Sequence, residues 1–125
     1  MTTFEGDFHK ESGRDAARLL WRQQPRSTGA FCCNDLMAYG VLDFLREQGA
    51  ACPEALSVIG YDDDARSSTC EPPLTTVRVP LIEIARTGTS RLVEYLTRQK
   101  RVGPFKGQEL FPVTLIIRQS VAKAP

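Results

Sequence analysis

The sequence lacks the patterns that would mark it as an enzyme or a metal protein. His9 is its one histidine, and it stands beside Lys10 and Glu11, far along the chain from any candidate nucleophile. A Gly-x-Ser-x-Gly turn, a phosphate-binding loop and a His-Glu-x-x-His motif are all missing. The four cysteines stand at positions 32, 33, 52 and 70, a spacing that fits no zinc motif. We therefore predict no catalytic residue, no metal site and no cofactor.

The sequence also has no excess of charge of one sign and no long apolar run. Sixteen basic and fifteen acidic side chains give a net charge of +1. Proteins that bind DNA phosphates usually present a basic face, so we do not expect this chain to bind DNA by itself. No segment suits a membrane helix, and the first residues do not resemble a signal peptide. Free cysteines fit a reducing compartment. We predict a cytoplasmic protein without membrane contact.

An alternation of helical and strand-like patterns is what the sequence does contain. Apolar residues recur at helical spacing over residues 10–22, 35–48 and 81–98. Short apolar runs at 30–33, 56–61 and 111–118 predict strands, and 74–79 predicts a strand or a crossover. Residues 120–125 have the composition of a disordered tail. This order predicts an α/β fold with a mainly parallel sheet, but no strand precedes the first helix.

The predicted helix 35–48 is apolar on more than one side. One stripe contains Met37, Val41, Phe44 and Leu45, whereas Leu36, Tyr39 and Leu42 add apolar area elsewhere. A helix of this kind packs on the sheet and also on something further. A second copy of the chain is one candidate for that further partner.

Two polar residues follow predicted strands and are candidates for a binding site. Asn34 follows the strand at 30–33, and Asp62 follows the strand at 56–61. Ligands of open parallel sheets bind beyond the carboxyl ends of the strands, and an amide with a carboxylate suits a ligand rich in hydroxyl groups. Each residue also has a purely structural interpretation, because Asn favours helix N-caps and Asp favours turns. The run from Asp62 to Asp64 lacks the alternating spacing of a calcium loop.

Several motifs in a fixed order carry a resemblance that covers nearly the whole chain. They are Gly6-Asp7-Phe8 followed by Glu11-Ser12-Gly13, Phe31-Cys32-Cys33-Asn34-Asp35-Leu36-Met37-Ala38, Leu56 to Asp63, Pro72-Pro73-Leu74-Thr75-Thr76-Val77, and the ending from Leu110 to Arg118. In this combination the chain resembles the LacI/GalR family of transcriptional repressors. The resemblance implies a truncated, three-layer, parallel-sheet lobe of a periplasmic-binding-protein-like (type I) fold.

The resemblance also implies how the chain is divided. Residues 1–77 would form most of the C-terminal lobe of an effector-binding domain, and 78–112 would be a crossover and helix that belong to an otherwise absent N-terminal lobe. Residues 113–118 would return as a strand to the C-terminal lobe, followed by a tail at 119–125. The implied function is to bind a small-molecule effector, a sugar or related metabolite, and to couple that binding to DNA release. Operator DNA would bind only through a helix-turn-helix outside this chain.

The site residues implied by the resemblance fall into two groups. The ligand-binding positions are Phe8, Asn34, Asp62, Val79 and Leu81, and the positions near a homodimer interface are Leu36, Tyr39, Asp43 and Cys70. Val79 stands where the family has a side chain that forms hydrogen bonds, which disfavours a galactoside as the ligand. Two other functions compete with this interpretation. A periplasmic sugar-binding receptor has the same fold but is disfavoured by four free cysteines, and a small α/β hydrolase would need a nucleophile–base pair that we do not find.

Overall fold

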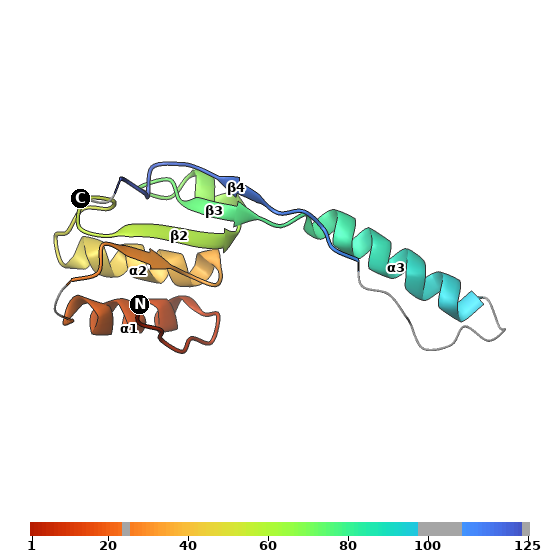
Figure 1. Ribbon diagram of the computed structural model, residues 1–125, viewed down its shortest axis with the longest axis horizontal. Helices are drawn as coiled ribbons and strands as arrows, with labels where there is room; N and C mark the ends of the chain where they lie inside the picture. Colours follow the sequence, from red (N-terminus) through yellow and green to blue (C-terminus); the bar gives the residue numbers. More distant parts are fainter. Residues whose placement is uncertain (24–25, 98–108, 124–125) are drawn as a thin grey trace. The chain divides into compact units, whose positions relative to one another are not determined.

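The structure, a computed structural model, describes residues 1–23, 26–97 and 109–123. In chain order these residues form α1 (Lys10–Trp21), β1 (Gly29–Phe31), α2 (Asp35–Glu47), β2 (Ser57–Asp62), the short 3₁₀ helix η1 (Ala65–Ser68), β3 (Thr75–Arg78), α3 (Leu81–Thr97) and β4 (Thr114–Ile116) (Figure 1). The predicted helices and strands are all present, and most of their ends lie within two residues of the predicted ones. Residue 98, the predicted end of the last helix, lies outside the described residues. Helix η1 is not among the helices that the sequence predicted.

The four strands form one sheet in the order β1-β2-β3-β4. Strands β1, β2 and β3 are parallel, and Phe31 pairs with Ile59 while Asp62 pairs with Arg78. Strand β4 is antiparallel to β3 and places Thr114 beside Arg78. The α/β fold with a mainly parallel sheet is therefore confirmed. Because β1 and β2 are parallel, the segments that follow them emerge at the same edge of the sheet.

Helix α2 is the centre of the core, since it packs against both β2 and α1. The two helices approach closely because glycines face each other's backbone. A Cβ atom on Gly13 would overlap the carbonyl group of Met37, and one on Gly40 would overlap the carbonyl oxygen of Lys10. This close packing places the segment before α1 beside the start of α2.

The extra apolar area of α2 is largely covered by this chain itself. Tyr39 is 2% exposed and Leu42 is 7% exposed, whereas Leu36 is 46% exposed. Tyr39 and Leu42 are therefore buried within one copy of the chain, and Leu36 is the one of the three that is exposed. Helical spacing shows which faces of a helix are apolar, but not whether α1, the sheet or η1 covers them.

The C-terminal tail is ordered through Ala122, which corrects the predicted disorder. Ser120 is fully buried, and its hydroxyl donates to the carbonyl oxygen of Val58 at 2.6 Å and accepts from the N–H of Thr75 at 2.8 Å. The carbonyl oxygen of Ser120 also accepts from the N–H of Val58 at 2.7 Å. One serine therefore joins β2 to β3 near their amino ends, without the apolar pattern that sequence analysis looks for.

The chain divides into two compact units. The first contains Met1–Arg78 and Thr114–Pro125, and the second contains Val79–Val113. Within the second unit α3 buries none of its residues, and Leu81, Ile84 and Leu92 of its apolar stripe are exposed. Across the described ranges, no helix has the length and apolar character needed to cross a membrane.

Candidate functional site

The loop that follows β2 carries three successive aspartates at the carboxyl edge of the sheet. The backbone of Asp62 has a φ of 113° and that of Asp63 a φ of 58°, so both lie in the left-handed region. Such conformations are uncommon for residues other than glycine and cost about 1–3 kcal/mol each. The carboxylates of Asp62, Asp63 and Asp64 meet different surroundings, and this difference separates structural roles from a binding role.

Asp64 is a structural residue, because it caps η1 and holds Tyr39. Its Oδ1 accepts the N–H of Arg66 at 2.8 Å and the N–H of Ser67 at 3.2 Å. The Tyr39 hydroxyl donates to the same oxygen at 2.5 Å, and the Arg66 guanidinium carbon lies 4.7 Å from the centre of the Tyr39 ring. Burial, followed by the bond to Asp64, raises the pKa of the Tyr39 hydroxyl. Tyr39 is thus held inside the chain.

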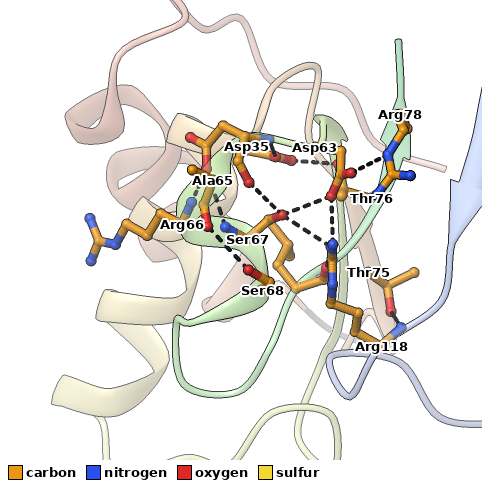
Figure 2. Close-up of polar contacts among 12 residues, drawn as sticks. Asp35, Asp63, Ala65, Arg66, Ser67, Ser68, Thr75, Thr76, Arg78 and Arg118 are labelled. Carbon is orange, nitrogen blue, oxygen red and sulfur yellow. Dashed lines mark hydrogen bonds and ion pairs between the residues drawn. The ribbon is translucent and has the colours of Figure 1, made fainter. Parts of the chain in front are cut away.

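Asp63 is the acceptor of two arginines (Figure 2). Arg78 donates through Nε to Oδ2 at 2.5 Å, and Arg118 donates through Nη2 to Oδ1 at 2.6 Å. The Ser67 hydroxyl donates to Oδ1 at 2.9 Å, and the Asp63 side chain is only 6% exposed. Burial acts to raise the pKa of Asp63, but the hydrogen bonds from Arg118, Arg78 and Ser67 outweigh it and lower the pKa.

Asp35, the first residue of α2, anchors the aspartate loop from beneath. It is 1% exposed, its Oδ1 accepts the Thr76 hydroxyl at 2.6 Å, and its Oδ2 accepts the N–H of Asp64 at 2.9 Å. Burial raises the pKa of Asp35, and the bonds from Thr76 and Asp64 act in the opposite direction. A Cβ atom on Gly60 would overlap the Asp35 carboxylate, so the glycine in β2 leaves room for this group.

Asp62 differs from its neighbours because its carboxylate has no hydrogen-bond or ion-pair partner among residues 1–23, 26–97 and 109–123. It is partly exposed at the end of β2. Burial, followed by the charge of Asp64, raises the pKa of Asp62. A partly exposed carboxylate with free acceptor positions can accept hydrogen bonds from ligand hydroxyl groups. The described ranges contain no group of three or more side chains that could hold a metal ion.

Asn34 lies at the same edge of the sheet and is an N-cap, as its structural interpretation predicted. Its Oδ1 accepts the N–H of Met37 at 2.9 Å, and its Nδ2 donates to the carbonyl oxygen of Phe8 at 2.8 Å. Because the amide nitrogen carries two hydrogens and donates one to Phe8, Asn34, which is 9% exposed, has a second amide hydrogen to offer. Phe8 has a φ of 66° and is 61% exposed. The structure thus brings Asn34 and Phe8 together and holds the Phe8 backbone in place.

The remaining predicted site residues are spread over both units. Val79 and Leu81 belong to the second unit. Asp43 is paired with Lys10 and with Arg46 on the surface of the helices. These positions keep their status as predictions from the resemblance.

Two further predicted interface positions, Leu36 and Cys70, lie in the first unit. Leu36 is exposed on the first turn of α2. The Cys70 thiol is partly buried beside the carbonyl oxygens of Ser67 and Pro72. The homodimer and its interface positions also stay a prediction from the resemblance.

Sequence reasoning missed Asp35, Arg118 and the separate roles of Asp63 and Asp64. The acidic run was visible, but nothing in it distinguishes a free aspartate from a paired one. Arg118 stands 55 residues from Asp63, so no local pattern connects them. The one available signal was Asp35 itself, an acidic residue inside an otherwise apolar segment that had to bury it.

Comparison with known proteins agrees with this geometry. The model of the periplasmic binding protein-like domain family matches residues 2–121. The HTH-type transcriptional repressor PurR of Haemophilus influenzae (strain PittEE) is 38% identical over 118 residues, which cover 94% of this chain and 35% of that protein. The chain therefore spans about a third of the length of the curated relatives it matches.

Solved structures show the same likeness. A LacI family transcriptional regulator from Enterococcus faecalis V583 with bound ribose has a TM-score of 0.85 and 34% identity, covering 95% of this chain and 43% of that one. The lac repressor dimer bound to operator and the anti-inducer ONPF has a TM-score of 0.81 and 32% identity, covering 94% of this chain and 40% of that one. The chain therefore belongs to the periplasmic binding protein-like domain family, in the form found in LacI-family transcriptional regulators.

Proposed function

We propose that this chain is part of the effector-binding region of a transcriptional regulator, and that Asp62 binds hydroxyl groups of a sugar or related metabolite. The observation that carries this proposal is that the Asp62 carboxylate has no partner among the described residues, whereas the carboxylates of Asp63 and Asp64 both accept hydrogen bonds within the chain. A carboxylate left unpaired at the carboxyl edge of a parallel sheet lies where such folds bind ligands. The similar regulator from Enterococcus faecalis holds ribose, which supports a sugar as the ligand class.

Other predicted positions would complete the site. Phe8 presents an exposed aromatic ring that suits stacking on the apolar face of a sugar ring, and Asn34 would add its remaining amide hydrogen. Val79 and Leu81 would contribute apolar contact. Because the chain covers 43% of the ribose-bound relative, we propose that residues outside it supply the rest of the cleft. We therefore expect the 125-residue chain by itself to bind sugars weakly.

We also propose that the protein containing this chain acts in the cytoplasm as a homodimer, and that it releases operator DNA when the effector binds. Leu36, Tyr39, Asp43 and Cys70 are the proposed interface positions, although a partner would meet the guanidinium of Arg66 rather than the buried Tyr39 ring. The near-zero net charge supports DNA binding through a helix-turn-helix outside this chain. Effector and DNA would then be coupled as two distinct sites on one molecule.

The test is calorimetry on the longest translation product that contains this chain, with ribose, cellobiose and sucrose as ligands. Asp62→Ala is expected to weaken binding of the preferred sugar by about 10-fold to 100-fold, the usual value of hydrogen bonds to a charged group. Asp15→Ala is the matched control, since it removes an exposed carboxylate of α1 that pairs with Arg18. Unchanged affinity in Asp62→Ala, or no binding of any sugar by the wild-type protein, would refute the proposal.

A further inference from the structure

Asp62 of β2 and Arg78 of β3 are partners in the register of two adjacent strands, yet their side chains do not form an ion pair. The register of β2 and β3 sets the two residues directly opposite. Opposite charges at such positions attract, and an arginine beside a carboxylate normally forms an ion pair. In the structure Arg78 donates instead to Asp63 at 2.5 Å, and the Asp62 carboxylate has no ion-pair partner among the described residues.

Asp63 competes successfully for the arginine because the fold prepares it to do so. Its left-handed backbone, with a φ of 58°, follows an equally unusual φ of 113° at Asp62. Arg118 and Ser67 bind the other carboxylate oxygen of Asp63, at 2.6 Å and 2.9 Å. The buried Asp63 side chain therefore satisfies both of its oxygens with three donors, two of them from arginines. Figure 2 shows Asp63 between Arg78 and Arg118.

The arginines come from the two segments that flank the second unit. Arg78 is the last residue of β3 and of the first part of the first unit, and Arg118 lies just beyond β4, where the chain has returned to it. Arg118 also donates through Nη1 to the carbonyl oxygen of Leu74 at 2.7 Å. Asp63 thus ties the aspartate loop to both strands that lead to and from the second unit.

We propose that Asp63 is a positioning residue for the effector site, because it draws Arg78 and Arg118 to itself and so keeps the Asp62 carboxylate unpaired for the ligand. This inference rests on the proposed function, since it assigns a task to the neighbour of the proposed ligand-binding residue. Loss of the Asp63 charge frees Arg78 to pair with Asp62 across the strands. The ligand hydroxyl would then compete with an ion pair for the same oxygens.

The first test uses the 125-residue chain and needs no ligand. Carboxyl ¹³C NMR titration of Asp62 is compared in the wild-type chain, in Asp63→Asn and in Ser120→Ala. The Asp62 titration midpoint is expected to fall in Asp63→Asn, because a newly paired arginine stabilises the charged carboxylate. Ser120→Ala is the matched control: it removes buried hydrogen bonds near the amino ends of β2 and β3, and it is expected to leave the Asp62 midpoint unchanged.

The second test measures binding by the longest translation product that contains this chain. For the tightest sugar of the panel, we expect Asp63→Asn to lower affinity about 10-fold. Monodeoxy analogues of that sugar identify the hydroxyl bound by Asp62, as the one whose removal weakens binding in the wild-type protein but not in Asp62→Ala. Removal of that hydroxyl is expected to lower affinity by a smaller factor in Asp63→Asn than in the wild-type protein. A general loss of stability would instead weaken binding of the parent sugar and of its deoxy analogue by the same factor.

The outcomes separate the two proposals. A falling Asp62 midpoint together with a smaller effect of the deoxy analogue supports the positioning role. An unchanged midpoint in Asp63→Asn overturns it, as does an affinity loss in Asp63→Asn no larger than that in Ser120→Ala. In either case a weaker binding by Asp62→Ala would still support the proposed function. Failure of the wild-type protein to bind any sugar overturns both. If Asp63→Asn does not fold, Asp63→Ser replaces it, since serine keeps a hydrogen-bond acceptor without the charge, and the Asp62 midpoint is again expected to fall; an unchanged midpoint overturns the positioning role. Adding Arg78→Gln to the Asp63 variant that folds removes the freed arginine and should return the Asp62 midpoint and the sugar affinity toward wild type, and no such return also overturns the role.

Discussion

The hydrogen bond between Asp35 and Thr76 offers the sharpest test of the buried polar contacts beneath the aspartate loop. Both side chains are buried, and they are joined at 2.6 Å although they stand 41 residues apart. Thr76→Val keeps the shape of the side chain but leaves one Asp35 oxygen without its donor. We expect the free energy of unfolding to fall by about 1.5–3 kcal/mol, the value of a hydrogen bond to a charged group.

Asp35→Ala has the larger expected effect because it orphans two donors. The Thr76 hydroxyl and the N–H of Asp64 would both lose their acceptor, and each buried unsatisfied group costs about 1–3 kcal/mol. In the Asp35→Ala background, Thr76→Val removes the hydroxyl that has lost its acceptor, so it should leave the free energy of unfolding unchanged or raise it by up to about 1–3 kcal/mol. The double-mutant cycle is therefore expected to show a coupling of at least about 1.5 kcal/mol.

Urea denaturation of the four proteins measures this coupling. Thr75→Val is the control, since Thr75 is the adjacent buried threonine of β3 and its hydroxyl accepts from the N–H of Arg118 at 2.9 Å rather than contacting Asp35. A cycle of Asp35→Ala with Thr75→Val should be additive to within about 0.5 kcal/mol. Equal costs of Thr76→Val in the wild-type and Asp35→Ala backgrounds would refute the assignment of this bond.

Three further predictions concern packing, pH and thiol chemistry. Gly40→Ala should lower the free energy of unfolding by about 1–3 kcal/mol in urea denaturation, because the added methyl group overlaps the backbone of α1. Gly88→Ala is the control: it has open space around it and should stabilise α3 slightly. Equal effects of the two substitutions would contradict the close packing of α1 and α2. The pKa of Asp63 is lowered from 3.8, so its charged carboxylate stabilises the fold above pH 3.8, and this stabilisation is lost as the pH falls through the lowered pKa. Acid unfolding of the wild-type chain should show this loss of stability, and acid unfolding of Asp63→Asn should not. Burial raises the pKa of the Cys32 thiol to about 12, so a thiol reagent at pH 8 should modify the exposed Cys33 first and Cys32 only on unfolding. Mass spectrometry after brief labelling measures both rates. Modification of Cys32 as fast as Cys33 would contradict the burial of Cys32.

Much of the fold could be predicted because its signals are local. The helices α1, α2 and α3 follow from apolar spacing, and Asn34 could be placed at the start of α2 from the N-cap preference of asparagine alone. The order of helices and strands indicates a parallel sheet, which the register of β1, β2 and β3 confirms. The tail around Ser120 was mispredicted because its order depends on hydrogen bonds to residues 45 and 62 positions away.

The candidate site was predictable only in part. That Asn34 and Asp62 follow neighbouring parallel strands can be worked out from the strand pattern, since such strands end at one edge of the sheet. That the Tyr39 ring is buried beneath the Arg66 guanidinium depends on where η1 folds back. A polar loop in the sequence does not reveal a 3₁₀ helix capped by Asp64.

The sequence by itself determined the α/β pattern, the family resemblance and the position of an acidic run at the end of a buried strand. Only the tertiary structure decided which aspartate of that run has no partner among the residues that the structure describes. The three are chemically identical, and the choice among them is made by Arg78, Arg118 and Tyr39, which arrive from distant parts of the chain. The physical reason is that ion pairs depend on atoms that meet within about 3 Å, and folding alone brings such atoms together.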